Sequence, residues 1–138
     1  MDNNRVKHLE MIQNIITRMN TNSFQIKGLS ITIIAALLAV YASTTKLDFI
    51  LFAIFPTILL WFLDAYCLLQ ERKFRGLYND VAGVTESLKP IKPFEMRSDL
   101  YKGGQYSYWI ILFSRTIWPL YFAILVLLLT TFIYLKLY

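Results

Sequence analysis

Three long apolar stretches constrain the fold of this chain more than any other feature: Gly28–Ser43, Phe49–Leu69 and Thr116–Leu135. Each stretch is apolar on all sides rather than along one helical stripe, which is the pattern that lipid requires. We therefore predict an all-α integral membrane protein with three transmembrane helices, forming a single membrane domain over residues 1–138. The second stretch contains a carboxylate, Asp64, and an ionisable side chain at membrane depth needs a partner or a function.

The basic residues are distributed unevenly around these stretches. Four precede the first stretch and eight lie between the second and third, whereas one lies in the short loop between the first two and one follows the third. Because cytoplasmic segments carry the excess of Lys and Arg, this asymmetry predicts a cytoplasmic N-terminus and an outside C-terminus. Topology thus accounts for the net charge of +5. We expect the basic residues to lie beside the lipid bilayer rather than to bind nucleic acid.

The residues before the first span predict an amphipathic helix over 4–20. Leu9, Ile12, Ile16 and Met19 recur at helical spacing and form one apolar face. That face could rest on the bilayer, pack against the cytoplasmic loop or contact another subunit. The capping residues of Asn20–Ser23 predict a break or bend before the span itself.

The spans are expected at residues 24–43, 48–69 and within 108–136. Ala35 and Ala39 on the first span form a small-xxx-small pair that permits close helix approach. Pro56 predicts a kink in the second span. After that span, residues 70–107 predict a cytoplasmic helix that stops at Gly83, and then a partly ordered loop. Residues 108–136 predict an interfacial turn and the third span, with a kink near Pro119.

Asp64 should be paired with a cation, because an isolated buried charge costs several kcal/mol. Topology places Lys27 and Arg115 at the same end of the spans as Asp64. We favour Arg115, since a guanidinium can bind a carboxylate through two parallel hydrogen bonds. Such an ion pair would connect the third span to the second.

A polar face runs along the second span, because Thr57, Trp61, Asp64, Leu68 and Glu71 recur at spacings of four and three. This face should point at protein or water rather than lipid. Either Asp64 on this face forms a structural ion pair within one monomer, or the face lines a pathway between subunits. Three spans are too few to enclose it within one monomer, so we expect a homo-oligomer to bury this face.

The sequence gives no sign of an enzyme or a cofactor site. His8 has no second ligand nearby in sequence, and the single cysteine, Cys67, excludes an intrachain disulfide and a cysteine-rich metal site. Gly103 and Gly104 indicate a turn rather than a phosphate-binding loop. We expect no metal ion and no catalytic residue.

Two segments carry a resemblance to known proteins. Residues 22–32, and residues 61–78 with the run Asp64-Ala65-Tyr66 followed by Glu71-Arg72-Lys73-Phe74-Arg75, resemble a group of small bacterial membrane proteins. That group is similar to the multi-span effectors of antiphage systems, including the SLATT-type class, and the resemblance covers about residues 20–80. It implies an inner-membrane effector in antiviral defence that assembles into pores and answers to a partner that senses infection. The positions that match the shared pattern are Lys27, Asp64, Glu71, Arg72 and Arg75.

Two functions therefore remain open. One is an oligomeric, ion-conducting effector gated by a cytoplasmic protein partner or small ligand. The other is a non-conducting anchor that recruits a cytoplasmic partner through the N-terminal helix and residues 71–107, with Glu71, Arg72, Lys73 and Arg75 as the contact surface. A transporter fits less well, because three spans without repeats leave little room for alternating access.

Overall fold

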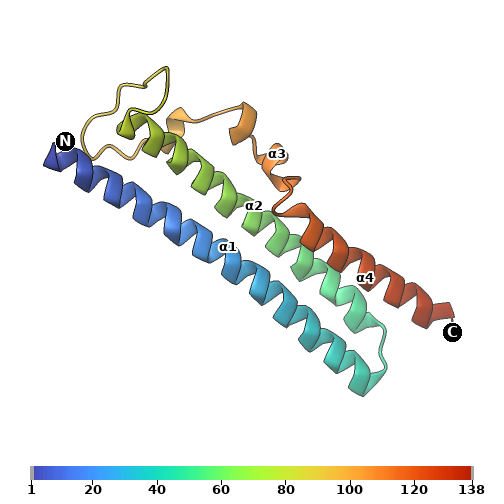
Figure 1. Cartoon of the computed structure of the whole chain (residues 1–138). Helices are drawn as coiled ribbons and strands as arrows, with labels where there is room; N and C mark the ends of the chain where they lie inside the picture. The colour runs from blue at the N-terminus through green and yellow to red at the C-terminus, as the bar shows by residue number, and fades with distance from the viewer. Residues whose placement is uncertain (1, 138) are drawn as a thin grey trace.

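The chain folds around one long helical hairpin. A computed structural model describes residues 2–137, which form α1 (Asn3–Thr44) and α2 (Asp48–Ala82), two short 3₁₀ turns η1 (Ser98–Leu100) and η2 (Gly104–Tyr106), and then α3 (Tyr108–Leu112) and α4 (Trp118–Leu137). α1 and α2 lie antiparallel along most of their length, and α4 packs on α2 (Figure 1). The hairpin turn is tight because Thr45 adopts a left-handed conformation and its N–H donates to the Tyr41 carbonyl.

Three helices are long and apolar enough to cross a membrane: α1, α2 and α4. α1 has 42 residues and α2 has 35. At 1.5 Å per residue they extend about 63 Å and about 52 Å, well beyond a hydrocarbon core of about 30 Å. The hairpin therefore continues into a second region, here called the head, which comprises residues 3–22, 70–82 and the connection 83–107.

The expected break at Asn20–Ser23 is wrong, because α1 runs through these residues without interruption. The hydroxyl of Thr21 donates to the Thr17 carbonyl one turn earlier, a bond that is compatible with a helix interior. The hydroxyl of Ser23 donates to Asp64 on α2. The hydroxyls of Thr21 and Ser23 are therefore engaged elsewhere and do not cap a new helix, so α1 continues.

The predicted helix stop at Gly83 is confirmed. α2 continues through Pro56 and ends at Ala82, and Gly83 adopts a positive φ of 74°. The N–H of Gly83 donates to the Asp80 carbonyl and that of Val84 to the Asn79 carbonyl, which satisfies two carbonyls at the helix end.

The segment that leads to the last helix is broken in two. α3 and α4 are separated by residues 113–117, and Pro119 lies in the first turn of α4. A proline is tolerated there because the first turn of a helix needs no N–H donor. The turn exposes Arg115 at its surface.

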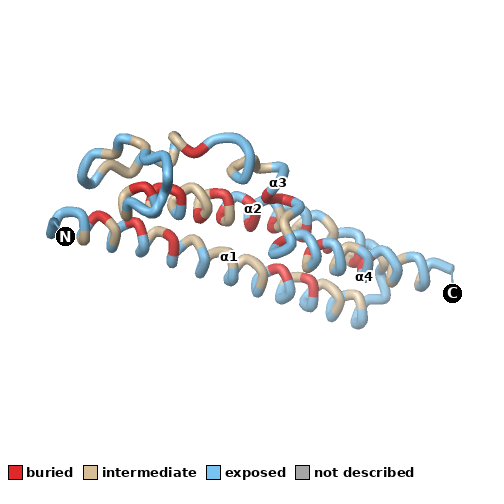
Figure 2. Tube along the Cα trace, turned by 45° about the horizontal axis from the view of Figure 1, so that its top comes forward, coloured by how far each residue is buried: buried red, intermediate tan, exposed pale blue. Residues whose placement is uncertain are grey.

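The core consists of three clusters arranged along the hairpin. In the head, Ile12 and Ile16 of α1 pack against Leu77 of α2 and Tyr101 of the connection. Three alternatives were open for the apolar face of the N-terminal helix: the bilayer, the cytoplasmic loop and another subunit. In the structure this face packs against the loop, here the connection, and also against α2. The other clusters lie around Leu60, Ala65, Ile111, Leu112, Ile117 and Tyr121, and around Ile34, Ile50, Ala53 and Leu128. Figure 2 shows buried residues along the facing sides of α1 and α2.

Candidate functional site

Asp64 is the centre of a polar network that joins three helices. Its side chain is fully buried on α2. The Nζ of Lys27 on α1 lies 2.6 Å from Oδ2, and the Tyr121 hydroxyl on α4 donates to the same oxygen over 3.0 Å. The Ser23 hydroxyl donates to Oδ1 and accepts a 2.8 Å hydrogen bond from Lys27 Nζ. Both carboxylate oxygens therefore have partners, which is the condition for burying this charge.

Regular helix spacing on α1 brings the partners of Asp64 together. Ser23, Lys27 and Ser30 lie four and three residues apart and therefore share one helical face. Ser30 is also fully buried, and its hydroxyl has no hydrogen-bond partner within residues 2–137. The network thus occupies one face of α1 against α2, and Tyr121 of α4 covers its other side.

The preference for Arg115 as the partner of Asp64 is wrong, and the alternative, Lys27, is the residue that forms the ion pair. Arg115 is exposed in the turn between α3 and α4, whereas the Asp64 carboxylate is fully buried. α4 does reach Asp64, but through Tyr121. A polar-tipped side chain within an otherwise apolar span is the sequence signal that could have identified Tyr121.

The polar face of α2 is enclosed by the monomer itself. Thr57 is buried and its hydroxyl donates to the Ala53 carbonyl. Trp61 donates from Nε1 to the Leu112 carbonyl, and its ring stacks on Tyr121 with centroids 6.1 Å apart. Our inference that a homo-oligomer is needed to bury this face is therefore wrong, since α1, α3 and α4 cover it within one chain.

The basic run after the second span does not form one uniform surface. Glu71 is only 6% exposed and accepts a 2.6 Å hydrogen bond from Arg75, so it lies inside rather than on a contact surface. Arg75 itself is exposed, whereas Arg72 and Lys73 are half-buried. Arg72 makes a long 3.5 Å bond to the Gln105 carbonyl. The cations remain accessible, and the carboxylate does not.

A second polar contact, which the sequence reasoning missed, attaches the connection to α2 in the head. Tyr101 is 3% exposed, and its hydroxyl donates to Oδ2 of Asp80 over 2.5 Å. Lys89 Nζ lies 3.9 Å from the centroid of the Tyr101 ring. Burial, and next the hydrogen bond to the Asp80 carboxylate, raise the pKa of the Tyr101 phenol above its ordinary value. The phenol is therefore held in its protonated, donating form.

Gly76 makes this attachment possible. A Cβ at this position would lie 2.7 Å from the Tyr101 ring and 2.6 Å from the Tyr106 hydroxyl, closer than such atoms approach. The two aromatic side chains, which contact each other edge to face, therefore pack directly on the helix backbone. The absence of a side chain at Gly76 is the only sequence sign of this contact.

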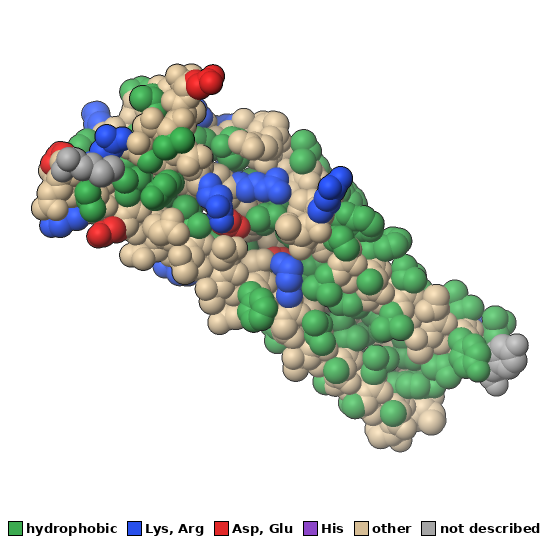
Figure 3. Space-filling view, in the orientation of Figure 1, with side chains coloured by type: hydrophobic (Ala, Val, Ile, Leu, Met, Phe, Trp, Pro, Cys, Tyr) green, Lys and Arg blue, Asp and Glu red, His purple; other side chains and the backbone are tan. Residues whose placement is uncertain are grey.

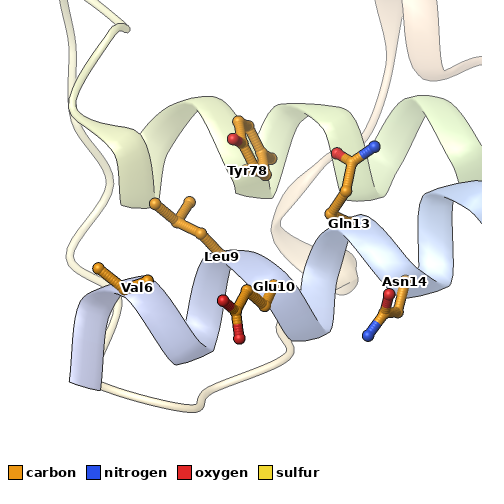
Figure 4. Close-up of a pocket in the computed structure, with 6 residues that line it drawn as sticks. All are labelled: Val6, Leu9, Glu10, Gln13, Asn14 and Tyr78. Carbon is orange, nitrogen blue, oxygen red and sulfur yellow. The ribbon is translucent and has the colours of Figure 1, made fainter. Parts of the chain in front are cut away.

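The head also carries an open groove between α1 and α2, of about 450 Å³. Figure 4 shows Leu9 and Gln13 of α1 pointing toward α2, which contributes Tyr78. Val6, Leu9 and Tyr78 give the groove most of its apolar lining, and Glu10, Gln13 and Asn14 add polar groups. His8 is buried nearby against the connection, where its ring nitrogen lies 3.2 Å from the Glu95 carbonyl. Within residues 2–137, no cluster of His, Cys, Asp and Glu is arranged to hold a metal ion.

Comparison of the chain with protein-family models, with curated proteins and with solved structures gives no match.

Proposed function

We propose that this chain is a membrane effector of the bacterial inner membrane, which assembles into a homo-oligomer and is controlled through its head by a cytoplasmic protein partner or small ligand. Three apolar helices support insertion, and the excess of Lys and Arg around the head supports its placement in the cytoplasm. The link to antiviral defence rests on the resemblance of residues 20–80 to the SLATT-type class.

One observation carries the proposed assembly: α1 presents a continuous face of small residues that the rest of residues 2–137 leaves exposed. The residues on this face recur at spacings of four and three, and all are exposed: Gly28, Thr32, Ala35, Ala39 and Ser43. Small residues let helix backbones approach closely, and they are enriched where membrane helices associate. We therefore assign this face to contact between copies of the chain.

The conducting pathway of this oligomer must lie between subunits. The Asp64 carboxylate is fully buried and both of its oxygens have partners within the monomer, so it is not free to line a pore. Ion conduction would then depend on how α1 faces meet rather than on the Asp64 carboxylate.

The decisive experiment compares two identical substitutions at exposed alanines. Ala39→Leu adds bulk to the small face of α1, whereas Ala123→Leu adds the same bulk to an exposed position on α4. We expect the detergent-solubilised wild type and Ala123→Leu to have the mass of an oligomer and to release ions from loaded vesicles. Ala39→Leu should have the mass of a monomer and release none. A monomeric wild type, or an Ala39→Leu protein that behaves as wild type, would refute the proposal.

The groove beside Leu9 and Tyr78 favours one alternative, a non-conducting anchor that recruits a cytoplasmic partner through the head. The same vesicle assay separates the two functions. An anchor would leave ion release at the level of empty vesicles in the wild type, whatever its oligomeric state. A Leu9→Arg substitution would then reduce partner recruitment while insertion persists.

A further inference from the structure

A second groove lies where the head meets the three candidate spans. Its volume is about 440 Å³, and α1, α2 and the turn before α4 all contribute to its lining, with Phe24, Lys27, Glu71, Arg72, Thr116 and Ile117 among the residues. Glu71 is the one acidic residue of this lining, and its carboxylate is paired with Arg75. Lys27 lies on α1 where its apolar stretch begins, Arg72 follows the apolar stretch of α2, and Thr116 precedes α4. The groove is therefore located at one edge of the membrane-crossing part of the fold.

Positive charge dominates this edge. Lys27, Arg72, Arg75 and Arg115 are exposed or half-buried, whereas the two carboxylates, Asp64 and Glu71, are buried. Figure 3 shows Lys and Arg side chains gathered across the middle of this face, between an end of mixed polarity and an end that is mostly hydrophobic. Four cations against two carboxylates leave a net positive charge at the surface.

The cations in the groove retain unused hydrogen-bond donors. A lysine ammonium has three N–H donors, and Lys27 uses two of them, for Asp64 and Ser23. Its side chain remains 25% exposed. An arginine guanidinium has five donors, and Arg72 uses one, in the 3.5 Å bond to Gln105. An anion seated here would gain charge-assisted hydrogen bonds from both residues without breaking the ion pair of Asp64.

Besides these cations, the region of the groove carries exposed apolar side chains. The Phe24 side chain is 78% exposed, and Trp118 and Phe122 at the start of α4 are also exposed. A free inorganic anion gains nothing from such surface, whereas acyl chains would cover it.

We propose that this groove binds the phosphodiester head group of an anionic phospholipid, with Arg72 and Lys27 donating to the phosphate and the acyl chains lying along Phe24 and α4. The proposal requires membrane insertion but not the proposed assembly, because every residue of the groove comes from one chain.

The test is native mass spectrometry of the detergent-solubilised full chain mixed with equal amounts of phosphatidylglycerol and phosphatidylcholine. We expect phosphatidylglycerol adducts to dominate in the wild type. Arg72→Gln should lower phosphatidylglycerol binding about tenfold, the loss expected for one charge-assisted hydrogen bond. Lys46→Gln is the matched control, since it removes the same charge from the hairpin turn at the far edge, and it should bind as the wild type does.

Three results would overturn the proposal: equal adducts of both lipids, equal binding by Arg72→Gln and Lys46→Gln, or inorganic phosphate displacing phosphatidylglycerol at equal concentration. If Arg72→Gln loses helical ellipticity, Thr116→Trp decides instead, because it fills the groove without removing a charge. Loss of phosphatidylglycerol binding in Thr116→Trp supports the site, and unchanged binding refutes it. The mass of the complex, measured in the same spectra, shows separately whether the oligomer forms.

Discussion

Lys27 Nζ lies 2.6 Å from Oδ2 of Asp64, and this contact joins α1 to α2 at the level where the apolar stretch of α1 begins and that of α2 nears its end. The lysine is partly exposed, whereas the carboxylate is fully buried. Asp64 consequently needs Lys27 to balance its charge, because water cannot reach the carboxylate. Lys27 is partly hydrated and needs Asp64 less.

Lys27→Ala should destabilise the fold by about 3–5 kcal/mol, because it leaves the buried Asp64 carboxylate without its cation. Arg115→Ala should change stability by less than about 0.5 kcal/mol, since Arg115 is exposed in a turn. Unfolding in mixed micelles with increasing denaturing detergent measures both variants. A larger effect from Arg115→Ala than from Lys27→Ala would contradict the pairing.

Tyr121→Phe should cost about 1–3 kcal/mol, because it removes the hydroxyl that donates to Asp64 and leaves that acceptor with fewer partners. The ring remains, so the stacking on Trp61 is retained. Tyr66→Phe is the matched control, since that side chain is 51% exposed on the same hairpin. The same unfolding assay applies, and equal stability of the two variants would show that the Tyr121 hydroxyl contributes nothing.

Gly76→Ala should displace the connection from α2, because the new methyl group would overlap the Tyr101 ring and the Tyr106 hydroxyl. Overpacking of this kind costs about 1–3 kcal/mol. Limited trypsin digestion reports it directly, since Arg97 and Lys102 lie in the connection and should be cut faster, whereas Lys89 and Lys92 precede prolines and resist trypsin. Gly28→Ala should leave the digestion pattern unchanged, because a Cβ there meets nothing within 4 Å.

The Tyr101 phenol should titrate above the ordinary tyrosine value of about 10. Because the folded-state pKa is raised, the stability that this group contributes is fully present below about pH 10 and is lost as the pH rises through the folded-state pKa. The tyrosinate absorbance of wild type minus that of Tyr101→Phe isolates this titration. A difference spectrum that titrates at or below the ordinary value would show that the phenol is not held by Asp80.

The parts of the fold that follow local rules could be predicted from the sequence. Three helices of the right length and apolarity follow from the composition of the stretches, and the end of α2 follows from Gly83. The break expected at Asn20–Ser23 was wrong for a tertiary reason. Ser23 is committed to Asp64, a residue 41 positions away, and propensity alone cannot detect that contact.

The candidate site could be predicted only in part. Which residues belong to it can be inferred from the sequence, but which of them contact each other depends on the tertiary structure. That Asp64 needs a cation follows from its burial, and Lys27 was one of two candidates. The choice between them depends on the turn at residues 113–117, which exposes Arg115, and its geometry is not encoded in any spacing. The contact of Tyr101 with Asp80 and Gly76 was missed because a loop aromatic residue gives no indication of which helix it meets.

The chain order of the Asp64 partners has a consequence for biogenesis. Ser23 and Lys27 are made before Asp64, whereas Tyr121 follows it by 57 residues. The hairpin can therefore close and neutralise its carboxylate while the remainder is still being translated. Tyr121 is made last, so the Asp64 carboxylate already has its cation, Lys27, before α4 is complete.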